Sequence, residues 1–366
     1  MKFEVINGTD RIGGSIVKIF GEKEAILIDL GNSLDGRILS DDILEHALEN
    51  VKDIFITHYH TDHVDLLNHP LLENKNIHLS GFTKKILENK GIVNYCNYYI
   101  FEQNDTIVID NLTIRPFKSD HSASDSYMFL ISNGDKTILH TGDFRMRGVE
   151  YNKIIDELYT SDIKIDLLMI DGTYYGYDYD FKSEFELKRY FEKAFIDNQY
   201  NFVFVPTTNF ARMKIISDSA KVTGHTVYMD NYVYKNYKEI YEPTNIKILR
   251  EMNIDKFRKE EFVMIFSPNN FFKEFYTCFN QAKRSLIYSA WPGYLNKKYK
   301  KIYDFFVDQI FTYIHTAGHS NTKDIDEFID IVKPNLILPL HTETKNEFID
   351  KYKNTLDIYD LMEYEI

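Results

Sequence analysis

The sequence predicts a layered α/β protein into which a second α/β segment is inserted, from about residue 181 to about residue 310. Up to about residue 180, short apolar runs separated by Gly, Asn and Asp turns indicate many strands and few helices. From about Phe181 onward, strands alternate with longer helices, as in a parallel sheet joined by crossover helices. After about residue 311, histidines return at the ends of apolar runs.

Each element is predicted from its periodicity and its flanking turn residues. Asp41 to Asn50 carries apolar residues at helical spacing behind an aspartate cap, which predicts an amphipathic helix. Further helices are expected at 82–89, 181–197, 210–221 and 322–332, and in a stretch that ends near 280. Strands are expected at 15–20, 25–30, 52–57, 77–80, 106–109, 112–117, 127–131, 136–140, 202–205, 226–229, 262–266, 285–289 and 335–338.

The composition is that of an ordinary globular protein large enough for two domains. Of 366 residues, 44% are apolar and 27% are charged, and the net charge of −13 argues against non-specific coating of nucleic acid. Cys96 and Cys278 are too few for a disulfide framework. Because the N-terminus lacks an apolar signal region and no run approaches 18 apolar residues, we expect a cytoplasmic protein without a membrane partner.

The strongest chemical signal follows the strand predicted at 52–57. His58, His60, Asp62 and His63 place three imidazoles and one carboxylate within six residues. On an extended segment His58 and His60 point to the same side, so both can reach one ion. Asp62 and His63 lie where the chain must turn and can serve a second ion. A polar surface loop is the alternative, but it explains the cluster less well.

Further ligand candidates lie at the ends of other predicted strands, namely His121, Asp143 and His341. Taken alone, each is more often a turn or cap residue. Together they complete a site for two ions, with His58, His60 and His121 on one, Asp62, His63 and His341 on the other, and Asp143 bridging both. Because a redox di-iron site would have Glu at position 60, His60 points to zinc and hydrolysis.

These motifs resemble those of the metallo-β-lactamase-fold hydrolases. That resemblance rests on the His-x-His-x-Asp-His motif, the later His121, the Thr-Gly-Asp that ends at Asp143 and the final His341. Three further motifs are similar to motifs A, B and C of the β-CASP subgroup: Asp171-Gly-Thr, His319 in Thr-Ala-Gly-His-Ser, and Pro339-Leu-His341. The segment from Val205 to Arg212, followed by a helix, is similar to the start of the β-CASP domain. The resemblance covers nearly the whole chain.

This resemblance implies an αββα metallo-β-lactamase sandwich with an inserted α/β β-CASP domain. Residues 1–180 and 311–366 would form the catalytic domain, and residues 181–310 would form the β-CASP domain over its metal edge, leaving a cleft. Characterised relatives are mainly nucleases, among them ribonuclease J. We therefore expect a nuclease with two Zn²⁺ ions per chain, or Mn²⁺ or Mg²⁺ in their place. Its expected substrate is single-stranded RNA, with DNA as the second choice.

The resemblance also suggests which residues act in catalysis. Phosphodiester cleavage needs a nucleophile, neutralisation of charge on the phosphate and a proton for the leaving oxygen. We expect His319 to be the general acid, Asp171 to orient it, and Asp62 to act with the metal ions; a plain helix N-terminal residue is the alternative for His319. Phosphate contacts are expected near a helix N-terminus and on the first β-CASP helix, from His315, Thr316, Ser320 and Arg212.

Three departures from the family pattern limit these expectations. Asp65 stands where many relatives have Gly, and motif A has Asp171 where several have Glu. No further domain follows His341, unlike ribonuclease J, so a homo-oligomer is left open. The tyrosine-dense stretch 174–179 either lines the cleft or fills a domain junction.

Two other functions are weighed against a nuclease. A hydrolase of a small phosphodiester, ester, lactone or cyclic nucleotide would use the same metal site, but the long insertion and His319 favour a polymeric substrate. A binding protein without catalysis is disfavoured because the set of metal ligands is complete.

Overall fold

The computed structural model describes residues 1–34, 36–92, 96–148, 163–251 and 253–366. Within them the chain divides into two compact units. Unit 1 comprises Met1–Met146, Glu150–Asp180 and Gly318–Ile366, and unit 2 comprises Arg147–Val149 and Phe181–Ala317.

The second boundary lies later in the chain than residue 311, where the sequence analysis placed it. Strand β17 (Thr312–Tyr313) pairs in parallel with β16 (Arg284–Tyr288), and the Ile314 N–H donates to the Tyr288 carbonyl at 3.1 Å. Residues 312–314 therefore extend the sheet of unit 2, and the chain returns to unit 1 at Gly318.

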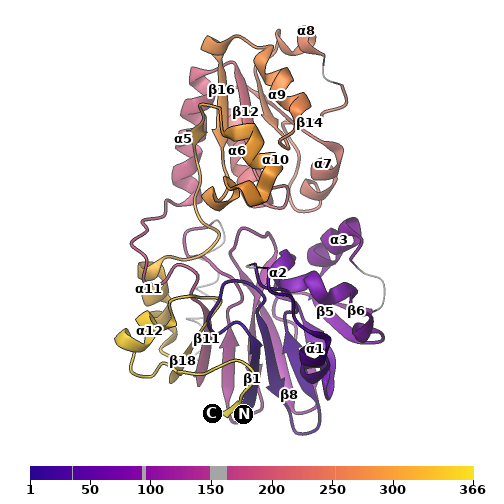
Figure 1. Cartoon of the computed structure of the whole chain (residues 1–366), viewed down its shortest axis with the longest axis vertical. Helices are drawn as coiled ribbons and strands as arrows, with labels where there is room; N and C mark the ends of the chain where they lie inside the picture. The colour runs from indigo at the N-terminus through magenta and orange to yellow at the C-terminus, as the bar shows by residue number, and fades with distance from the viewer. Residues whose placement is uncertain (35, 93–95, 149–162, 252) are drawn as a thin grey trace. The chain divides into compact units, whose positions relative to one another are not determined.

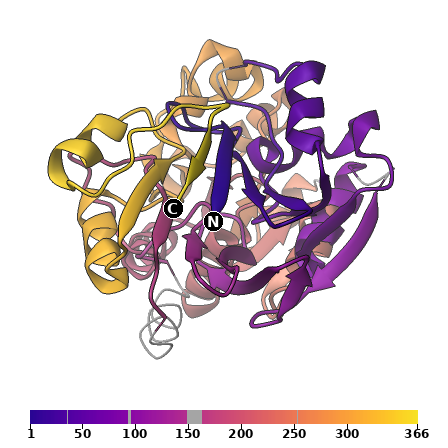
Figure 2. The ribbon, with the colours of Figure 1, turned by 90° about the horizontal axis from the view of Figure 1, so that it is seen from below.

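The first sheet of unit 1 has the strand order β19-β1-β2-β3-β4-β5-β6. Its strands are β1 (Lys2–Asn7), β2 (Ile16–Phe20), β3 (Ala25–Ile28), β4 (Val51–Phe55), β5 (Asn76–Ser80), β6 (Asn97–Phe101) and β19 (Glu363–Glu365). β3 to β6 pair in parallel, and the remaining pairs are antiparallel. The sequence analysis did not predict β1 or β19, which pair and bring the two ends of the chain together (Figure 2).

The second sheet has the order β18-β11-β10-β9-β8-β7. Its strands are β7 (Ile107–Ile109), β8 (Leu112–Ser119), β9 (Ser126–Ser132), β10 (Thr137–His140), β11 (Leu167–Asp171) and β18 (Leu336–Leu340). Both β8 and β10 are antiparallel to β9, and β11 and β18 continue in parallel from β10. The carboxyl ends of β8, β10, β11 and β18 therefore share one edge of the sheet.

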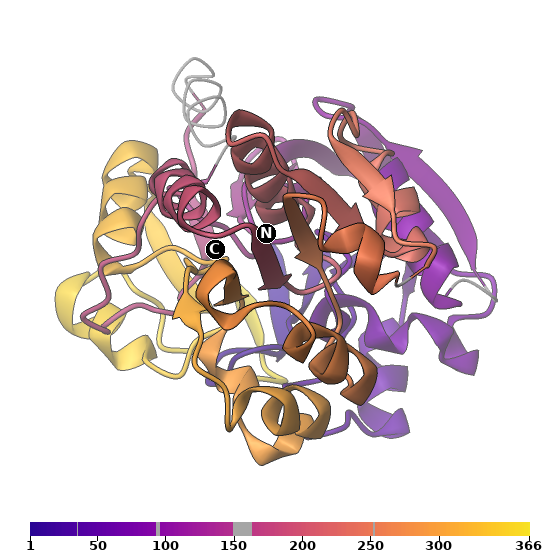
Figure 3. The ribbon, with the colours of Figure 1, turned by 90° about the horizontal axis from the view of Figure 1, so that it is seen from above.

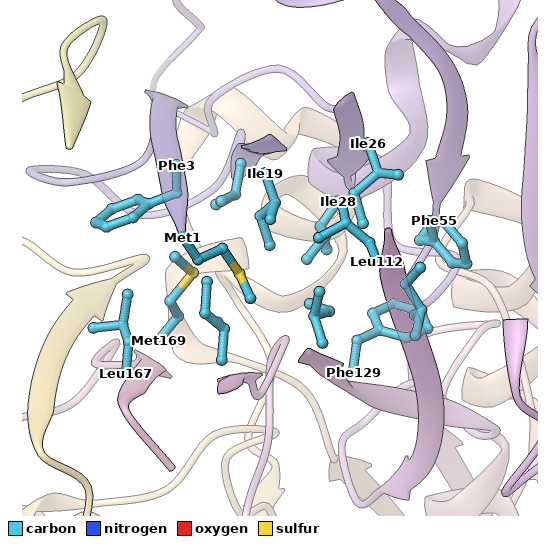
Figure 4. Close-up of a cluster of buried hydrophobic side chains, with 14 of the residues drawn as sticks. Met1, Phe3, Ile19, Ile26, Ile28, Phe55, Leu112, Phe129, Leu167 and Met169 are labelled. Atoms are coloured by element: carbon cyan, nitrogen blue, oxygen red, sulfur yellow. The ribbon is translucent and has the colours of Figure 1, made fainter. Parts of the chain in front are cut away.

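An apolar layer joins the two sheets face to face. Phe3, Ile28 and Phe55 of the first sheet belong to one cluster with Phe129 and Met169 of the second, and each is at most 1% exposed (Figure 4). Alternate residues of each strand enter this layer, as the period-2 geometry of a strand requires. A slip by one residue would turn these side chains to the opposite face, so the layer fixes the register of both sheets.

Helices cover the outer faces of the two sheets. α1 (Asp41–Leu48) packs on β4, and α3 (Gly81–Lys90) packs on β5. Apolar residues of α11 (Thr322–Val332) and α12 (Lys345–Lys351) join a cluster on the outer face of the second sheet. Figure 1 shows these two helix pairs on opposite sides of the paired sheets. The predicted αββα sandwich is confirmed.

Unit 2 is built on a parallel sheet with the order β14-β13-β15-β12-β16-β17. Its other strands are β12 (Tyr200–Phe204), β13 (Thr226–Met229), β14 (Ile246–Ile248) and β15 (Phe262–Ile265). Its helices are α5 (Glu184–Asp197), α6 (Phe210–Val222), α7 (Asn231–Tyr237), α8 (Ile254–Phe257), α9 (Asn270–Thr277) and α10 (Lys300–Phe306).

Aromatic side chains make up much of the core of unit 2. Phe202 of β12 and Phe262 of β15 lie in one cluster with Phe275 of α9 and Phe306 of α10. Figure 3 shows α5 and α6 on one side of the sheet and α9 and α10 on the other. This confirms the α/β architecture predicted for the inserted segment. Among the described residues, no helix is both long enough and apolar enough to cross a lipid bilayer.

Candidate metal centre

Within the described ranges, three groups of ligand atoms lie where strands of both sheets of unit 1 end. Two of them match the predicted ligand sets, and the third joins Asp143 and His341 to Asp171 and His319. In the first group, His58, His60 and His121 each offer a ring nitrogen, and these atoms lie within 4.8 Å of one another. His60 Nδ1 is 3.1 Å from His121 Nε2. Since His58 follows β4 and His121 follows β8, this group spans the two sheets.

The second group consists of Asp62, His63, Asp143 and His341, all of them buried. His341 Nε2 lies 3.2 Å from Asp62 Oδ2, and His63 Nε2 lies 3.3 Å from Asp143 Oδ2. Asp62 and His63 belong to α2 (Thr61–Val64), a single helical turn at the point where the sequence predicted that the chain turns.

The Asp143 carboxylate lies between the two groups. Its Oδ2 is 3.8 Å from His58 Nε2, 3.7 Å from His121 Nε2 and 3.3 Å from His63 Nε2. A single carboxylate is therefore within reach of ligand nitrogens from both groups, as a bridging ligand must be. Gly142, with a φ of 53°, makes the turn that aims this carboxylate, and a Cβ there would lie 2.9 Å from the Cβ of Thr57.

These side chains fit a pair of divalent metal ions. His58 Nε2 is buried and has no hydrogen-bond partner in the described part of the chain. A buried polar atom without a partner costs about 1–3 kcal/mol, which an ion that takes its lone pair would remove. Imidazole nitrogens combined with carboxylate oxygens form a donor set suited to zinc.

Hydrogen bonds on the far side of the rings set their orientation. His63 Nδ1 lies 2.7 Å from Asp29 Oδ2, and the Asp29 carboxylate also accepts from the N–H and the hydroxyl of Thr57, each at 2.8 Å. His121 Nδ1 donates to the Gly318 carbonyl at 2.5 Å. Because a carboxylate or a carbonyl oxygen accepts only, both contacts place a hydrogen on Nδ1 and leave Nε2 for a metal.

The end of β3 approaches α2 closely enough to exclude a side chain at Gly31. A Cβ at Gly31 would lie 2.0 Å from the Asp62 carbonyl oxygen and 2.5 Å from His63 N. The Leu30 N–H donates to the His63 carbonyl at 2.8 Å, which holds the two segments together. Asp29 has a φ of 59°, a left-handed conformation that few residues besides Gly, Asn and Asp adopt.

The sequence-predicted acid pair adjoins the second group. His319 Nδ1 lies 2.7 Å from Asp171 Oδ2, and His319 Nε2 lies 4.0 Å from Asp143 Oδ2. Asp171 is buried, whereas the His319 side chain is 18% exposed. The His319 ring is thus held at Nδ1 by the Asp171 carboxylate, and part of the ring is exposed to solvent.

Burial and charge divide the ligand histidines into two sets. Burial lowers the pKa of His58 and the pKa of His121 well below their ordinary value, and it lowers the pKa of His60 to about 4. Burial also acts to lower the pKa in the second group, but the Asp143 carboxylate and its neighbours outweigh it. They raise the pKa of His341 to about 9 and the pKa of His63 well above its ordinary value. Before an ion binds, the first group is therefore neutral and the second holds protons.

Two of the predicted phosphate contacts are buried and bonded to the backbone. Ser320 is 2% exposed; its hydroxyl accepts from the Met146 N–H at 3.1 Å, and its N–H donates to the Phe144 carbonyl at 2.9 Å. Thr316 is 5% exposed, and its hydroxyl donates to the Lys182 carbonyl at 2.5 Å. Both hydroxyls therefore support local backbone structure.

Arg212, a third predicted phosphate contact, lies in a buried ion pair. It is completely buried in unit 2, and its Nε and Nη2 donate to the two carboxylate oxygens of Glu184 at 2.7 and 2.9 Å. Its Nη1 donates to the Ser289 hydroxyl at 2.8 Å and lies 3.4 Å from His315 Nδ1. The guanidinium of Arg212 is thus held by Glu184, and His315, a fourth predicted phosphate contact, lies beside it.

Sequence reasoning missed the residues that orient the ligands, chiefly Asp29, Thr57 and Thr173. The Thr173 hydroxyl lies 2.8 Å from His341 Nδ1. Asp29 could have been found, because an aspartate that follows an apolar run and comes shortly before a glycine is close to the signal that identified Asp143. Thr57 and Thr173 carry no signal beyond their positions beside the His58 and Asp171 motifs.

Comparisons with known proteins show which proteins this chain resembles. Residues 25–186 match the β-lactamase superfamily domain. A solved protein of unknown function from Enterococcus faecalis superposes with a TM-score of 0.77 and 16% identity over 99% of both chains, which shows the fold of the whole chain.

Three curated proteins are similar in sequence over about half of the chain or less. The probable RNase MJ4 of Methanocaldococcus jannaschii is 30% identical over 44% of this chain and 43% of its own length. Ribonuclease J of Helicobacter pylori is 27% identical over 43% of this chain and 25% of its own. The human DNA cross-link repair 1A protein is 26% identical over 52% of this chain and 18% of its own. The matches thus span less than half of the length of each relative.

The Asp143→Asn substitution tests the bridging position. It removes the charge that both groups share, so we expect roughly tenfold or greater loss of affinity for both ions, measured as bound zinc per chain after equilibrium dialysis. Asp65→Asn, which changes an exposed carboxylate just beyond α2, should leave both ions in place. Retention of two ions by Asp143→Asn would contradict the bridging assignment.

Acidification should release the two ions at different pH values. Because the pKa of His341 is about 9 before an ion binds, an ion that binds to the second group must displace at least one proton. The affinity of the second group for zinc should therefore fall about tenfold for each unit by which the pH is lowered. The first group should be unaffected between pH 8 and pH 6, since the pKa of His60 is about 4. Calorimetric zinc titrations at several pH values would measure this, and a common pH midpoint for both ions would argue against it.

The Arg212→Met substitution should destabilise unit 2, because it leaves the Glu184 carboxylate buried without its partner. The expected loss is about 3–5 kcal/mol in urea denaturation. Lys214→Met on the same helix removes only a partly exposed pair with Asp218 and should cost at most about 1 kcal/mol. If Arg212→Met kept full stability but lost affinity for phosphate-containing ligands, the original phosphate assignment would be restored.

Proposed function

Since this chain has the metallo-β-lactamase fold and the motifs of its β-CASP subgroup, we propose that it is a metal-dependent hydrolase of phosphodiester bonds, with single-stranded RNA as its substrate. The observation that carries this proposal is the position of Asp143. Its carboxylate reaches ligand nitrogens of both metal groups and lies 4.0 Å from Nε2 of His319. A two-ion site and a proton donor therefore converge at one edge of unit 1.

Two divalent ions held by these residues would lower the pKa of a shared water towards neutrality and offset the negative charge of a phosphate. The donor set favours zinc as the ion, with two ions per chain. Asp62 belongs to this arrangement as a ligand that His341 contacts at 3.2 Å.

His319 is suited to give a proton to the leaving oxygen. Burial acts to lower the pKa of His319, but the Asp171 and Asp143 carboxylates outweigh it and raise that pKa above its ordinary value. This shift favours the protonated form of His319. Asp171 accepts from Nδ1, so the proton on Nε2 is the one directed away from Asp171 and available for transfer.

An aromatic cluster beside His319 supports an unpaired strand as the substrate. The ring of Tyr174 lies 6.0 Å from that of His319 and 5.4 Å from that of Tyr179, and Tyr177 stacks on Tyr179 at 5.8 Å. Tyr177 is 38% exposed and Tyr179 is 50% exposed. Exposed aromatic rings stack on unpaired bases, a contact worth about 1–3 kcal/mol per base. The names of the relatives, two of which are ribonucleases, agree with this choice.

Cleavage of end-labelled single-stranded RNA tests the proposal. The zinc-loaded protein should shorten or cut single-stranded RNA that carries either a 5′-monophosphate or a 5′-triphosphate. DNA of the same sequence is tested in parallel as a second substrate. Loss of the monophosphorylated RNA alone, from its end, would indicate a 5′ exoribonuclease, and internal cuts in both RNAs would indicate an endonuclease. If every strand stays intact while a small phosphodiester or lactone is hydrolysed, the small-substrate alternative replaces the nuclease.

His319→Ala should lower kcat by about 10²–10⁴ because it removes the proton donor. Bound zinc per chain should not change, since His319 is not among the proposed metal ligands. His46→Ala, which removes a partly exposed histidine that pairs with Glu4, serves as the control and should keep full turnover. Unchanged turnover in His319→Ala would remove its role as the acid.

A further inference from the structure

The hydroxyl of Thr173 lies at the junction between the second metal group and the acid pair. It donates to Asp171 Oδ1 at 2.6 Å, and it lies 2.8 Å from His341 Nδ1 and 3.2 Å from His319 Nδ1. Thr173 is 5% exposed, so water does not compete freely for these contacts. All four residues belong to unit 1.

The single hydroxyl hydrogen determines the direction of each bond. A carboxylate oxygen accepts only, so the 2.6 Å contact uses the hydrogen of Thr173 to bond Asp171 Oδ1. The His341 carbonyl lies farther away, at 3.2 Å, and competes poorly for the same hydrogen. The hydroxyl lone pairs must then accept, and His341 Nδ1 must donate to them.

This direction fixes the tautomer of His341. With its hydrogen on Nδ1, a neutral His341 has its free lone pair on Nε2, the atom that lies 3.2 Å from Asp62 Oδ2 and 3.9 Å from Asp143 Oδ1. The lone pair is thus directed into the second metal group. His341 also has a φ of 54°, a left-handed conformation that is uncommon outside Gly, Asn, Asp and His.

The same hydroxyl also holds the carboxylate that orients His319. Asp171 Oδ1 accepts from both the hydroxyl and the N–H of Thr173, at 2.6 and 3.0 Å. With Oδ1 anchored, Oδ2 faces His319 Nδ1 at 2.7 Å. One side chain therefore connects a metal ligand with the proposed proton donor through direct hydrogen bonds.

We propose that Thr173 is a positioning residue, which sets the tautomer of His341 for the second metal ion and orients Asp171 towards His319. The part that concerns His319 rests on the proposed function, whereas the part that concerns His341 rests only on metal binding. Thr173 itself touches neither the ion nor the substrate.

The test compares Thr173→Val, which keeps the side-chain shape but removes the hydroxyl, with Thr173→Ser, which keeps the hydroxyl. Zinc titrations should show an affinity at the second group that is about 10–100-fold lower in Thr173→Val, near normal in Thr173→Ser, and unchanged at the first group in both. Thr83→Val is the matched control, because the buried Thr83 hydroxyl has no hydrogen-bond partner among the described residues.

Nitrogen-15 spectra of the histidine rings give a readout that does not depend on turnover. In the zinc-loaded wild-type protein, His341 should show hydrogen on Nδ1 and metal on Nε2. The opposite tautomer would overturn the proposal, whether or not Thr173→Val folds. So would two zinc ions bound with wild-type affinity by a folded Thr173→Val protein.

Kinetics separate this inference from the proposed function. If the wild-type protein cleaves RNA, kcat should fall in Thr173→Val at saturating zinc with little change in KM, and it should recover in Thr173→Ser. A wild-type kcat in Thr173→Val under these conditions would overturn the link to His319. If the wild-type protein cleaves no nucleic acid but the zinc and spectroscopic effects are seen, the proposed function fails and the role of Thr173 in metal binding stands.

Discussion

The position of the Asp143 carboxylate is the constraint on which unit 1 depends. It lies between 3.3 and 3.9 Å from ring nitrogens that follow β4, β8 and β18, strands that belong to two different sheets. A shift of either sheet by one residue would separate these atoms. The apolar layer between the sheets therefore does more than stabilise the fold, because it holds the ligand-bearing strand ends opposite one another.

The residues around this carboxylate form two layers, the candidate ligand rings and the groups that hold those rings. The ligand rings surround Asp143, and behind them lie acceptors that hold the rings: Asp29 behind His63 and the Gly318 carbonyl behind His121. This arrangement has a conformational cost, since Asp29 adopts a left-handed backbone and Gly31 can carry no side chain. The fold accepts local strain where the ligands must be aimed.

The structure brings together the side chains that the sequence analysis grouped as candidate metal ligands, whereas the sequence analysis missed the residues around them, for a physical reason. His58, His60, Asp62 and His63 are close together in the chain, so their spacing alone indicates a common site. The bond from Thr173 to His341 joins residues 168 positions apart, and no local pattern reports such a contact. Arg212 shows the same limit: the family resemblance suggested a phosphate contact, but no local pattern indicated its buried ion pair with Glu184, 28 positions earlier in the chain.

The order of ligands along the chain has a consequence for biosynthesis. Residues 181–317 of unit 2 lie between β11 and α11 in sequence, so a ribosome makes them after His58 and Asp143 but before His319 and His341. Strands β18 and β19, the last strands of the two sheets of unit 1, also follow unit 2 in the chain. Nearly all of unit 2 is one continuous segment that can fold while translation continues, whereas the ligand cluster cannot be complete until His341, its last member along the chain, has left the ribosome. The nascent protein is thus kept from assembling both ligand groups until unit 2 has been made.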